Sequence, residues 1–468
     1  MPDLASIVKA YDIRGLVPDQ LDEDVARAVG GAFVRTLTEQ GAPPSAVVVG
    51  RDMRPSSPAL AAAFADGVTC QGADVVDIGL ASTDQLYYAS GSLDLPGAMF
   101  TASHNPARYN GIKLCRAGAA PVGAESGLVR VRELAESGVP PVTTPGSIRS
   151  ADLLDAYAEY LLGLVPMPSG RRLTVVVDAG NGMAGHTAPV VLSRIDLDLV
   201  PLYFELDGSF PNHEANPIDP ANLRDLQDAV RRHSADVGLA FDGDADRCFC
   251  VDERGEAVSP STLTALIAMR MLADEPGARV IHNLITSRAV PEIVAEHGGQ
   301  AVRTRVGHSF IKQTMAETGA VFGGEHSGHF YFRDFWRADS GMLAALHLLA
   351  ALAGQPAPLS SMLAGYRRYA ASGEVNSEVH DQMEATRAVR AAFASRRGVT
   401  MDDLDGLTVA GEDWWFNLRP SNTEPLLRLN VEAADDAAME GLRDEVLALV
   451  RAAPAPVPVD DQGGDRAH

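Results

Sequence analysis

Residues 46–78 read AVVVGRDMRPSSPALAAAFADGVTCQGADVVDI. The β-branched run Ala46–Gly50 predicts a strand, the Ala/Leu-rich run Pro58–Gly67 predicts a helix, and Ala73–Ile78 predicts a second strand. Strands that alternate with helices in this way indicate layered α/β structure. The same rhythm recurs at three later runs: Leu173–Asp178, Val237–Phe241 and Arg279–Ile281. We therefore expect an α/β protein.

The length of the chain allows several such units. Its 468 residues suffice for three or four domains of about 100–150 residues. Pro/Gly-rich or polar stretches suggest boundaries near residues 138–146, 252–255 and 370–375, and a helix over Ser150–Leu164 opens the second unit. We expect four domains and a disordered tail rich in Pro, Asp, Gly and Gln. The four domains would span residues 1–146, 147–252, 253–370 and 371–453, and the tail residues 454–468.

The composition limits the partners and the compartment. The net charge of −23 argues against a nucleic acid or an anionic membrane, and any phosphate site must gather its own cations. We see no signal peptide, and the longest apolar run, Met342–Ala353, is too short to span a bilayer and predicts a buried helix. The four cysteines form no C-x-x-C pair, so we expect reduced thiols and a cytoplasmic protein.

A serine loop follows the apolar run Gly97–Phe100. Its residues are Ser103-His104-Asn105-Pro106, and the proline fixes φ and turns the chain. An exposed hydroxyl on a tight turn is one way in which proteins present a nucleophile. Ser103 is therefore a candidate nucleophile, with an ordinary surface turn as the alternative.

An acidic loop follows the predicted strand Val237–Phe241. It reads Asp242-Gly243-Asp244-Ala245-Asp246-Arg247, and three alternating carboxylates can converge on Mg²⁺ or Ca²⁺. Arg247 beside them suits an anionic oxygen and so points to phosphate. A calcium hand would end at Glu253, but Arg247 occupies the position that needs glycine in that motif. A solvated acidic loop is the remaining alternative.

Two more loops combine groups that suit a phosphosugar. Residues 324–329 read GEHSGH, where Glu325 and Ser327 suit vicinal hydroxyls and His329 can move a proton near neutral pH. Residues 419–425 read RPSNTEP and offer several hydrogen-bond donors for phosphate oxygens, although a plain surface turn has the same composition.

Other motifs are less specific. Lys113 lies ten residues beyond Ser103 and could accept or donate a proton if its pKa were lowered. Arg51-Asp52, with Arg54, begins another turn. Residues 180–185 read GNGMAG, which fits a dinucleotide motif as well as a simple glycine-rich turn.

Taken together, the loops at 101–106, 242–247, 324–329 and 419–425 resemble those of the α-D-phosphohexomutase superfamily, closest to its phosphomannomutase/phosphoglucomutase group. The resemblance spans about residues 6–450. It implies three similar α/β domains with mixed sheets and a smaller α+β fourth domain around a central cleft. It also implies interconversion of hexose 1-phosphate and hexose 6-phosphate, Mg²⁺, a phosphoserine, and a hexose 1,6-bisphosphate that acts as intermediate and activator.

The same resemblance implies a role for individual residues. The catalytic residues would be Ser103, His104, Lys113, Arg247 and His329. Mg²⁺ would be held by Asp242, Asp244, Asp246 and an oxygen on Ser103. The substrate would be bound by Tyr11, Arg14, His308, Glu325, His326, Ser327, Arg419, Ser421, Asn422 and Thr423. The fourth domain is expected to close over the cleft, because the bisphosphate must not escape while it reorients.

Details of the sequence bear on the substrate without fixing it. Asn422 and His326 favour mannose or glucose substrates over those of phosphoglucosamine mutases, which remain an alternative. Ile285 stands where several relatives have a lysine, so Arg288 or His308 would have to supply that contact. The sequence also leaves open a catalytically silent phosphosugar-binding paralogue and a metal-dependent phosphatase. The partner would be a small phosphosugar, and the protein a monomer or a dimer.

Overall fold

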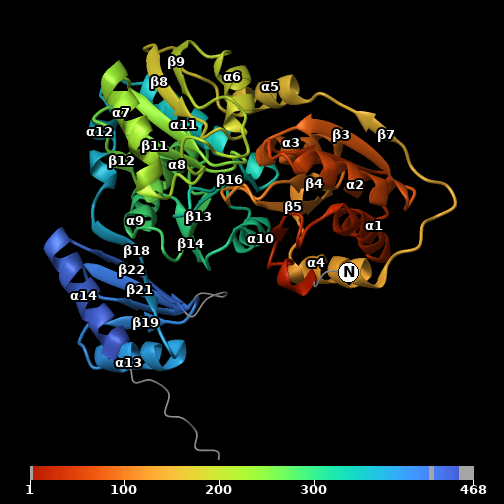
Figure 1. Ribbon diagram of the computed structural model, residues 1–468. Helices are drawn as coiled ribbons and strands as arrows, with labels where there is room; N and C mark the ends of the chain where they lie inside the picture. The colour runs from red at the N-terminus through yellow and green to blue at the C-terminus, as the bar shows by residue number, and fades with distance from the viewer. Residues whose placement is uncertain (1–3, 421–425, 453–468) are drawn as a thin grey trace, which may run out of the picture. The chain divides into compact units, whose positions relative to one another are not determined.

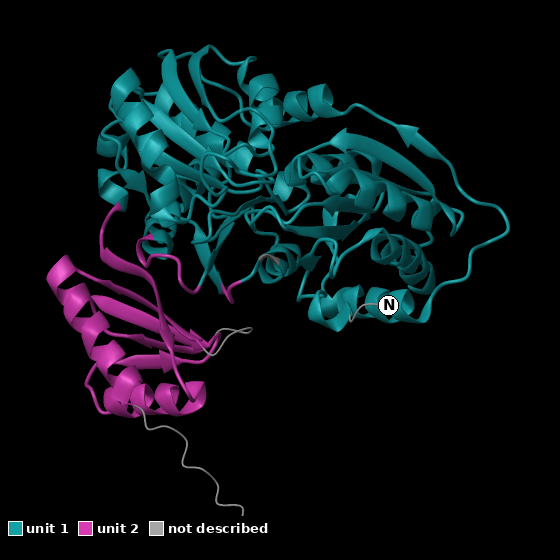
Figure 2. Ribbon diagram, in the orientation of Figure 1, with its two compact units in different colours: residues 1–283, 290–303, 307–366 teal, residues 284–289, 304–306, 367–468 magenta. Residues whose placement is uncertain are grey.

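The computed structural model describes residues 4–420 and 426–452, which form two compact units (Figures 1 and 2). Unit 1 comprises residues 1–283, 290–303 and 307–366, and it contains three sheets. Unit 2 comprises residues 284–289, 304–306 and 367–468, and it contains a fourth, antiparallel sheet. The predicted class, three α/β domains with mixed sheets and a smaller α+β domain, is confirmed.

The first sheet of unit 1 has seven strands in the order β1-β5-β4-β2-β3-β7, with β6 paired to β5. Its strands are β1 (Ile13–Leu16), β2 (Ala46–Arg51), β3 (Asp74–Leu80), β4 (Gly97–Phe100), β5 (Tyr109–Arg116), β6 (Ala120–Pro121) and β7 (Ile148–Ser150). Its helices are α1 (Glu23–Glu39), α2 (Ser57–Thr69), α3 (Thr83–Leu93) and α4 (Leu128–Ser137). Strands β2, β3, β4 and β7 pair in parallel, whereas β5 runs antiparallel to β4 and β1.

The unbroken apolar run of β2 is explained by burial on both faces of this sheet. Val47 and Val49 belong to a core with residues of α1, α2 and α4, whereas Val48 belongs to a second core with Leu86 and Ala89 of α3. A strand covered on both faces needs apolar residues at successive positions and not at alternate ones. Helices therefore cover both faces of the first sheet.

The second sheet has the order β12-β11-β10-β8-β9. Its strands are β8 (Leu173–Asp178), β9 (Leu197–Leu202), β10 (Val237–Phe241), β11 (Cys248–Asp252) and β12 (Ala257–Val258), and its helices are α5 (Leu154–Leu164), α6 (Ala184–Leu192) and α7 (Arg224–His233). The helix expected from residue 150 begins only at Leu154, because residues 148–150 extend along β3 as β7.

The third sheet has the order β14-β13-β15-β16-β17. Its strands are β13 (Arg279–Asn283), β14 (Gln300–Thr304), β15 (Phe322–Gly324), β16 (Phe330–Phe332) and β17 (Ala338–Asp339), and its helices are α8 (Pro260–Asp274), α9 (Ala289–Glu296), α10 (His308–Thr318), α11 (Gly341–Ala353) and α12 (Leu359–Met362). The run Met342–Ala353 forms most of α11 and is buried, as expected.

Unit 2 is built on an antiparallel sheet with the order β18-β22-β21-β20-β19. Its strands are β18 (Ala370–Glu378), β19 (Thr400–Asp402), β20 (Leu407–Ala410), β21 (Trp414–Pro420) and β22 (Leu426–Ala433), and its helices are α13 (Gln382–Ala394) and α14 (Asp436–Ala452). Both helices contribute residues to its core, including Phe393 and Val446. Within residues 4–420 and 426–452, no helix combines the length and the apolar character that a membrane span requires.

Candidate active site

Ser103 lies in the loop between β4 and β5, in the first sheet. Its φ of 51° places a non-glycine residue in the left-handed region, and its amide donates to Thr101 Oγ1 at 2.9 Å. The hydroxyl was expected to be exposed, but Ser103 is only 3% exposed. The physical reason is the acidic loop after β10, which covers it: a Cβ on Gly243 would lie 2.4 Å from the Ser103 carbonyl oxygen. A side chain at position 243 would clash with the Ser103 backbone, which explains the glycine in the acidic loop.

Three side chains surround the Ser103 hydroxyl. Ser103 Oγ donates to Asp242 Oδ2 at 2.7 Å and accepts from Arg247 Nη2 at 3.0 Å, while His104 Nδ1 lies 3.2 Å away. Arg247 also donates to His104 Nδ1, which must then be the acceptor nitrogen of a neutral ring. Burial and the Arg247 charge lower the pKa of His104 to about 2, so the ring stays neutral.

The three carboxylates of the acidic loop converge as predicted. Oxygens of Asp242, Asp244 and Asp246 lie within 4.8 Å of one another, and all three residues are buried. Burial raises the pKa of Asp242 to about 7, despite the opposing Arg247 charge. The Oδ1 atom of Asp244 is buried without a hydrogen-bond partner among the described residues, and Asp246 Oδ1 has His329 Nε2 at 3.5 Å. Oxygen ligands of this kind fit a hard divalent cation such as Mg²⁺.

Lys113 on β5 lies against this cluster. Its Nζ contacts Asp244 Oδ2 and Asp246 Oδ2, each at 2.6 Å. Burial lowers the pKa of Lys113, but the two carboxylates together raise it above its ordinary value. The condition named from the sequence, a lowered pKa, is not met here, because two anions lie beside the ammonium group.

Arg14 and Tyr11 come from the N-terminal segment of unit 1. Arg14 lies on β1 and donates to Asp12 Oδ2 at 2.7 Å and to Asn105 Oδ1 at 2.6 Å, which ties it to the serine loop. A Cβ on Gly307, just before α10, would lie 4.0 Å from Tyr11 Cε1. The N-terminal segment therefore reaches both the serine loop and the third sheet.

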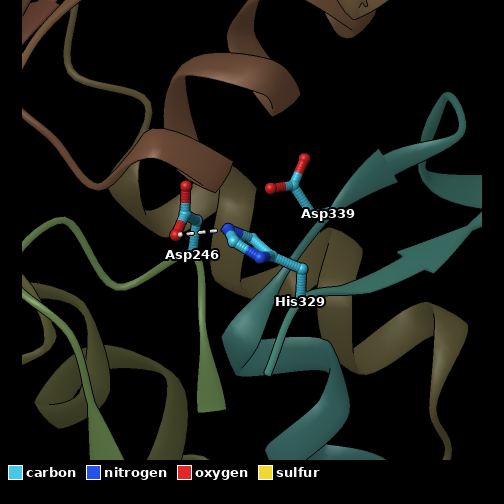
Figure 3. Close-up of side chains that lie close together, drawn as sticks. All are labelled: Asp246, His329 and Asp339. Carbon is cyan, nitrogen blue, oxygen red and sulfur yellow. Dashed lines mark ion pairs between the residues drawn. The ribbon is translucent and has the colours of Figure 1, made fainter. Parts of the chain in front are cut away.

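His329 joins the second and third sheets. Its backbone forms an antiparallel bridge with Arg247, and its Nε2 lies 3.5 Å from Asp246 Oδ1 (Figure 3). Burial lowers the pKa of His329, but Asp246 raises it by more. Figure 3 also shows Asp339 of β17 close to the ring, and Asp339 is itself paired with Lys312 Nζ at 2.7 Å.

Glu325 is the buried member of the 324–329 loop. Its Oε1 accepts from Asn283 Nδ2 and from the Gly307 amide, both at 3.2 Å, and its Oε2 accepts from Tyr331 at 2.7 Å. Ser327 Oγ lies 2.9 Å from His329 Nδ1 and is half-buried, as is His326. His308 begins α10 directly after Gly307. These protein contacts fix the carboxylate of Glu325 beside His329.

The remaining candidate residues belong to unit 2. Arg419 on β21 donates to Glu374 Oε2 at 2.6 Å. Ser421, Asn422 and Thr423 lie outside the described residues. Ile285 packs in an apolar cluster with Trp415. Arg288 donates its amide to Glu432 at 2.9 Å, and its guanidinium lies over the Tyr369 ring.

Contacts around the site include residues to which the sequence assigned no role. Thr83 Oγ1, at the start of α3, donates to Asp244 Oδ2 at 2.6 Å. In sequence, Ser82-Thr83-Asp84 indicates only a helix cap, and Ser82 does cap α3. The glycine-rich turn at 180–185 packs against the acidic loop, since the Met183 amide donates to the Gly243 carbonyl at 2.9 Å.

Three α/β domains, a buried serine between a carboxylate and an arginine, and an acidic cluster that could hold a cation are the features of a phosphotransferase of the hexose phosphate mutase kind. Four family models match in chain order: phosphoglucomutase/phosphomannomutase alpha/beta/alpha domain I over residues 5–133, domain II over 155–255, domain III over 259–369, and the C-terminal domain over 374–449. The chain belongs to the phosphoglucomutase/phosphomannomutase family.

Similar proteins agree with this assignment. A phosphomannomutase of Escherichia coli is 40% identical over 455 residues, which are 95% of this chain and 98% of that protein. A solved phosphoglucomutase/phosphomannomutase family protein of Burkholderia thailandensis is 35% identical, covers 98% of this chain and 100% of its own, and has a TM-score of 0.88. A serine-to-alanine variant of Aspergillus fumigatus N-acetylphosphoglucosamine mutase, solved with glucose 1,6-bisphosphate, shares the fold at 15% identity, with coverage of 98% and 97% and a TM-score of 0.61.

Proposed function

We propose that this chain interconverts hexose 1-phosphate and hexose 6-phosphate, of mannose or glucose, through a phosphorylated Ser103 and a hexose 1,6-bisphosphate. The observation that carries the proposal is the placement of Ser103 Oγ between Asp242 Oδ2 and Arg247 Nη2. A guanidinium in contact with this oxygen suits a phosphoryl group attached to it. Membership of the family supports the same reaction.

The acidic loop supplies the cation site that such a phosphoserine needs. A phosphoryl group on Oγ would bring negative charge against Asp242, which is buried and 2.7 Å from the unmodified hydroxyl. We infer that Asp242, Asp244 and Asp246 hold Mg²⁺ together with an oxygen on Ser103. Bound there, Mg²⁺ would neutralise charge on the transferring phosphoryl oxygens.

The transfer step uses groups of this chain for charge and for protons. A free hydroxyl of the hexose monophosphate attacks the phosphorus; the new P–O bond forms as the bond to Ser103 Oγ breaks. Arg247 holds the charge that remains on the oxygens, and neutral His104 fixes the position of its guanidinium. The hydroxyl proton passes to His329, which lies against Asp246. Lys113, which its two carboxylate partners keep protonated, can donate a proton to the departing Ser103 oxygen. The reverse sequence at the other phosphate returns the phosphoryl group to Ser103.

Sugar recognition has to tolerate both orientations of the bisphosphate. Glu325 and Ser327 lie beside His329. Their carboxylate and hydroxyl groups can bind two neighbouring hydroxyls of the sugar in either orientation of the ring. We assign His326, His308, Tyr11 and Arg14 to further substrate contacts. The phosphate that is not reacting would bind Arg419, Ser421, Asn422 and Thr423, since this loop offers a guanidinium and several neutral donors.

The proposed bounds of the four domains remain 1–146, 147–252, 253–370 and 371–453, carrying the phosphoserine, the metal, the sugar contacts and the distal phosphate in that order. We propose a cytoplasmic enzyme, in keeping with cysteines that are all free of disulfides. Its partner would be a small phosphosugar and its assembly state monomer or dimer.

The test is a coupled assay on mannose 1-phosphate and glucose 1-phosphate, with Mg²⁺ and a trace of the matching 1,6-bisphosphate. We expect isomerisation of at least one substrate by protein that intact mass spectrometry shows to be phosphorylated. Ser103→Ala should abolish both turnover and the added phosphate, yet still bind sugar phosphate in calorimetry. Ser193→Ala, at an exposed serine after α6, serves as the control and should behave as wild type.

Two results would count against this function. Phosphorylated protein that isomerises neither substrate but binds both would favour the silent phosphosugar-binding paralogue. Activity on glucosamine 1-phosphate that exceeds activity on both hexose 1-phosphates would favour a phosphoglucosamine mutase.

A further inference from the structure

Arg54 is a fully buried arginine that no step of the proposed reaction uses. It follows β2 in the turn Arg51-Asp52-Met53-Arg54, and its side chain has no exposed surface. Burying a guanidinium is costly unless its charge is paired and its donors are satisfied. The hydrogen-bond partners of the Arg54 guanidinium therefore indicate which part of the structure this residue stabilises.

Every N–H of the Arg54 guanidinium has an acceptor. Nε donates to Asp52 Oδ2 at 3.1 Å. The remaining donors bind four backbone carbonyls between Ser103 and the start of β5: Nη1 donates to Pro106 and Tyr109, each at 2.9 Å, and Nη2 donates to Ser103 at 2.9 Å and Asn105 at 2.7 Å. An arginine offers five such donors in a rigid plane, so this arrangement uses all of them.

The guanidinium is in turn fixed from two sides. Asp52 accepts from the Arg54 amide at 3.0 Å and from Ser57 Oγ at 2.6 Å, so the carboxylate is held in place. On the other side, the Phe210 ring lies 5.2 Å from Arg54 Cζ, and a Cβ on Gly208 would lie 2.7 Å from Arg54 Cα. The loop that carries Phe210 follows β9 of the second sheet. The residues around the first sheet and those around the second sheet therefore both hold Arg54 in place.

The serine loop needs such a support. Ser103 has a φ of 51°, a strained conformation for a non-glycine residue that persists only where the surroundings impose it. Four carbonyls that converge on one point would repel one another without a cation between them. Arg54 supplies that cation and defines the path of the chain from Ser103 to Tyr109.

We propose that Arg54, anchored by Asp52, is a positioning residue that sets the conformation of the serine loop and so places Ser103 Oγ for phosphoryl transfer. Within the described part of the chain, the Arg54 side chain hydrogen-bonds neither the Ser103 hydroxyl nor a proposed substrate-binding side chain, so it acts through the loop backbone. The inference rests on the proposed phosphoserine reaction for its kinetic consequence, whereas its structural consequence is independent of that reaction.

The test compares wild type with Arg54→Lys. Lysine keeps the charge, but its three donors sit on a single nitrogen and cannot span the four carbonyls and the carboxylate. We expect kcat to fall about 100-fold, as for a misplaced reacting group, with KM for the hexose phosphate changed by less than about 3-fold. Hydrogen exchange of the peptide covering residues 101–110 should become about 10-fold faster.

The matched control is Arg108→Lys, the same substitution at an exposed arginine of the same loop. It should leave kcat, KM and the exchange of residues 101–110 as in wild type. Should Arg54→Lys fail to fold, Asp52→Asn decides the question on the same readouts, because it removes the anionic anchor and leaves the guanidinium in place.

The outcomes separate this inference from the proposed function. A folded Arg54→Lys with wild-type exchange of residues 101–110, or with a loss of kcat matched by an equal rise in KM, overturns the positioning role. Asp52→Asn with unchanged exchange and kcat overturns it as well. If wild type proves inactive on both hexose 1-phosphates, the proposed function fails, and faster exchange in Arg54→Lys still supports Arg54 as the support of the loop.

Discussion

Replacing Thr83 by valine would isolate one hydrogen bond at the proposed cation site. Thr83 Oγ1 donates to Asp244 Oδ2 at 2.6 Å, and both residues are buried. Valine has nearly the same shape, so the change removes the donor and leaves a methyl group in its place. The Thr83 amide, which donates to the Asp244 carbonyl at 3.0 Å, keeps the backbone of the acidic loop attached to α3.

The size of the effect follows from the charge on Asp244. A hydrogen bond to a charged group contributes about 1.5–3 kcal/mol, and about 1.4 kcal/mol corresponds to a factor of ten. If the bond serves to orient the carboxylate, Mg²⁺ should bind about 10- to 150-fold more weakly to Thr83→Val. Losses of about 10- to 100-fold are usual when a partner of a metal ligand is removed.

The assay is the Mg²⁺ dependence of the mutase rate, with calorimetric titration of Mg²⁺ into the protein as a readout that needs no turnover. Thr36→Val is the matched control: Thr36 is 2% exposed, and its hydroxyl has no hydrogen-bond partner among the described residues. The control should leave Mg²⁺ affinity unchanged. Thr83→Val with an affinity within about 2-fold of wild type would refute the reasoning, since a shift that small is within the error of independent sites.

Other consequences can be measured on the same protein. Gly67→Ala would put a Cβ 2.0 Å from the Arg27 carbonyl where α1 and α2 cross, so we expect urea unfolding to show a free energy of unfolding lower by about 1–3 kcal/mol. The control Gly163→Ala, in α5 with open space around it, should leave that free energy unchanged or raise it by up to about 1 kcal/mol. Burial lowers the pKa of His213, but Asp178 raises it by more. The protonated pair therefore stabilises the fold fully below the unfolded pKa of about 6.5, and the gain is lost as pH rises through the higher folded pKa. His213→Gln should lower the free energy of unfolding by about 1–2 kcal/mol at pH 6 and by less at pH 8.5; an equal loss at both would contradict the ion pair. Chelation of divalent ions should stop turnover with little change in melting temperature, because cationic side chains of the protein still pair the buried carboxylates; a collapse of the fold would contradict this.

The sequence predicted the parts of the fold that local pattern determines. The strands at 173–178 and 237–241 have the expected bounds, because short apolar runs between turn residues specify them. The convergence of the acidic loop was also predictable, since its three carboxylates are close in sequence.

What the sequence did not predict depends on segments far apart in the chain. The burial of Ser103 and the raised pKa of Lys113 both come from the acidic loop, more than a hundred residues downstream. Arg54 was visible only as part of a turn, because its acceptors are carbonyl groups and backbone carbonyls carry no sequence signal. Thr83 was hidden for a related reason, since its hydroxyl reaches across to a different sheet.

The distance along the chain between Ser103 and its partners also bears on how the protein is made. Ser103 and Asp242 are 139 residues apart, and Arg247 pairs with a residue of the third sheet, His329. At about 5–20 residues per second, roughly 7–28 s of synthesis separate the serine from the loop that covers it. During that interval the first sheet can fold, because the strands that flank Ser103 are already present. We therefore expect the serine hydroxyl to stay open to solvent during that interval, and its enclosure has to wait until the acidic loop has been made.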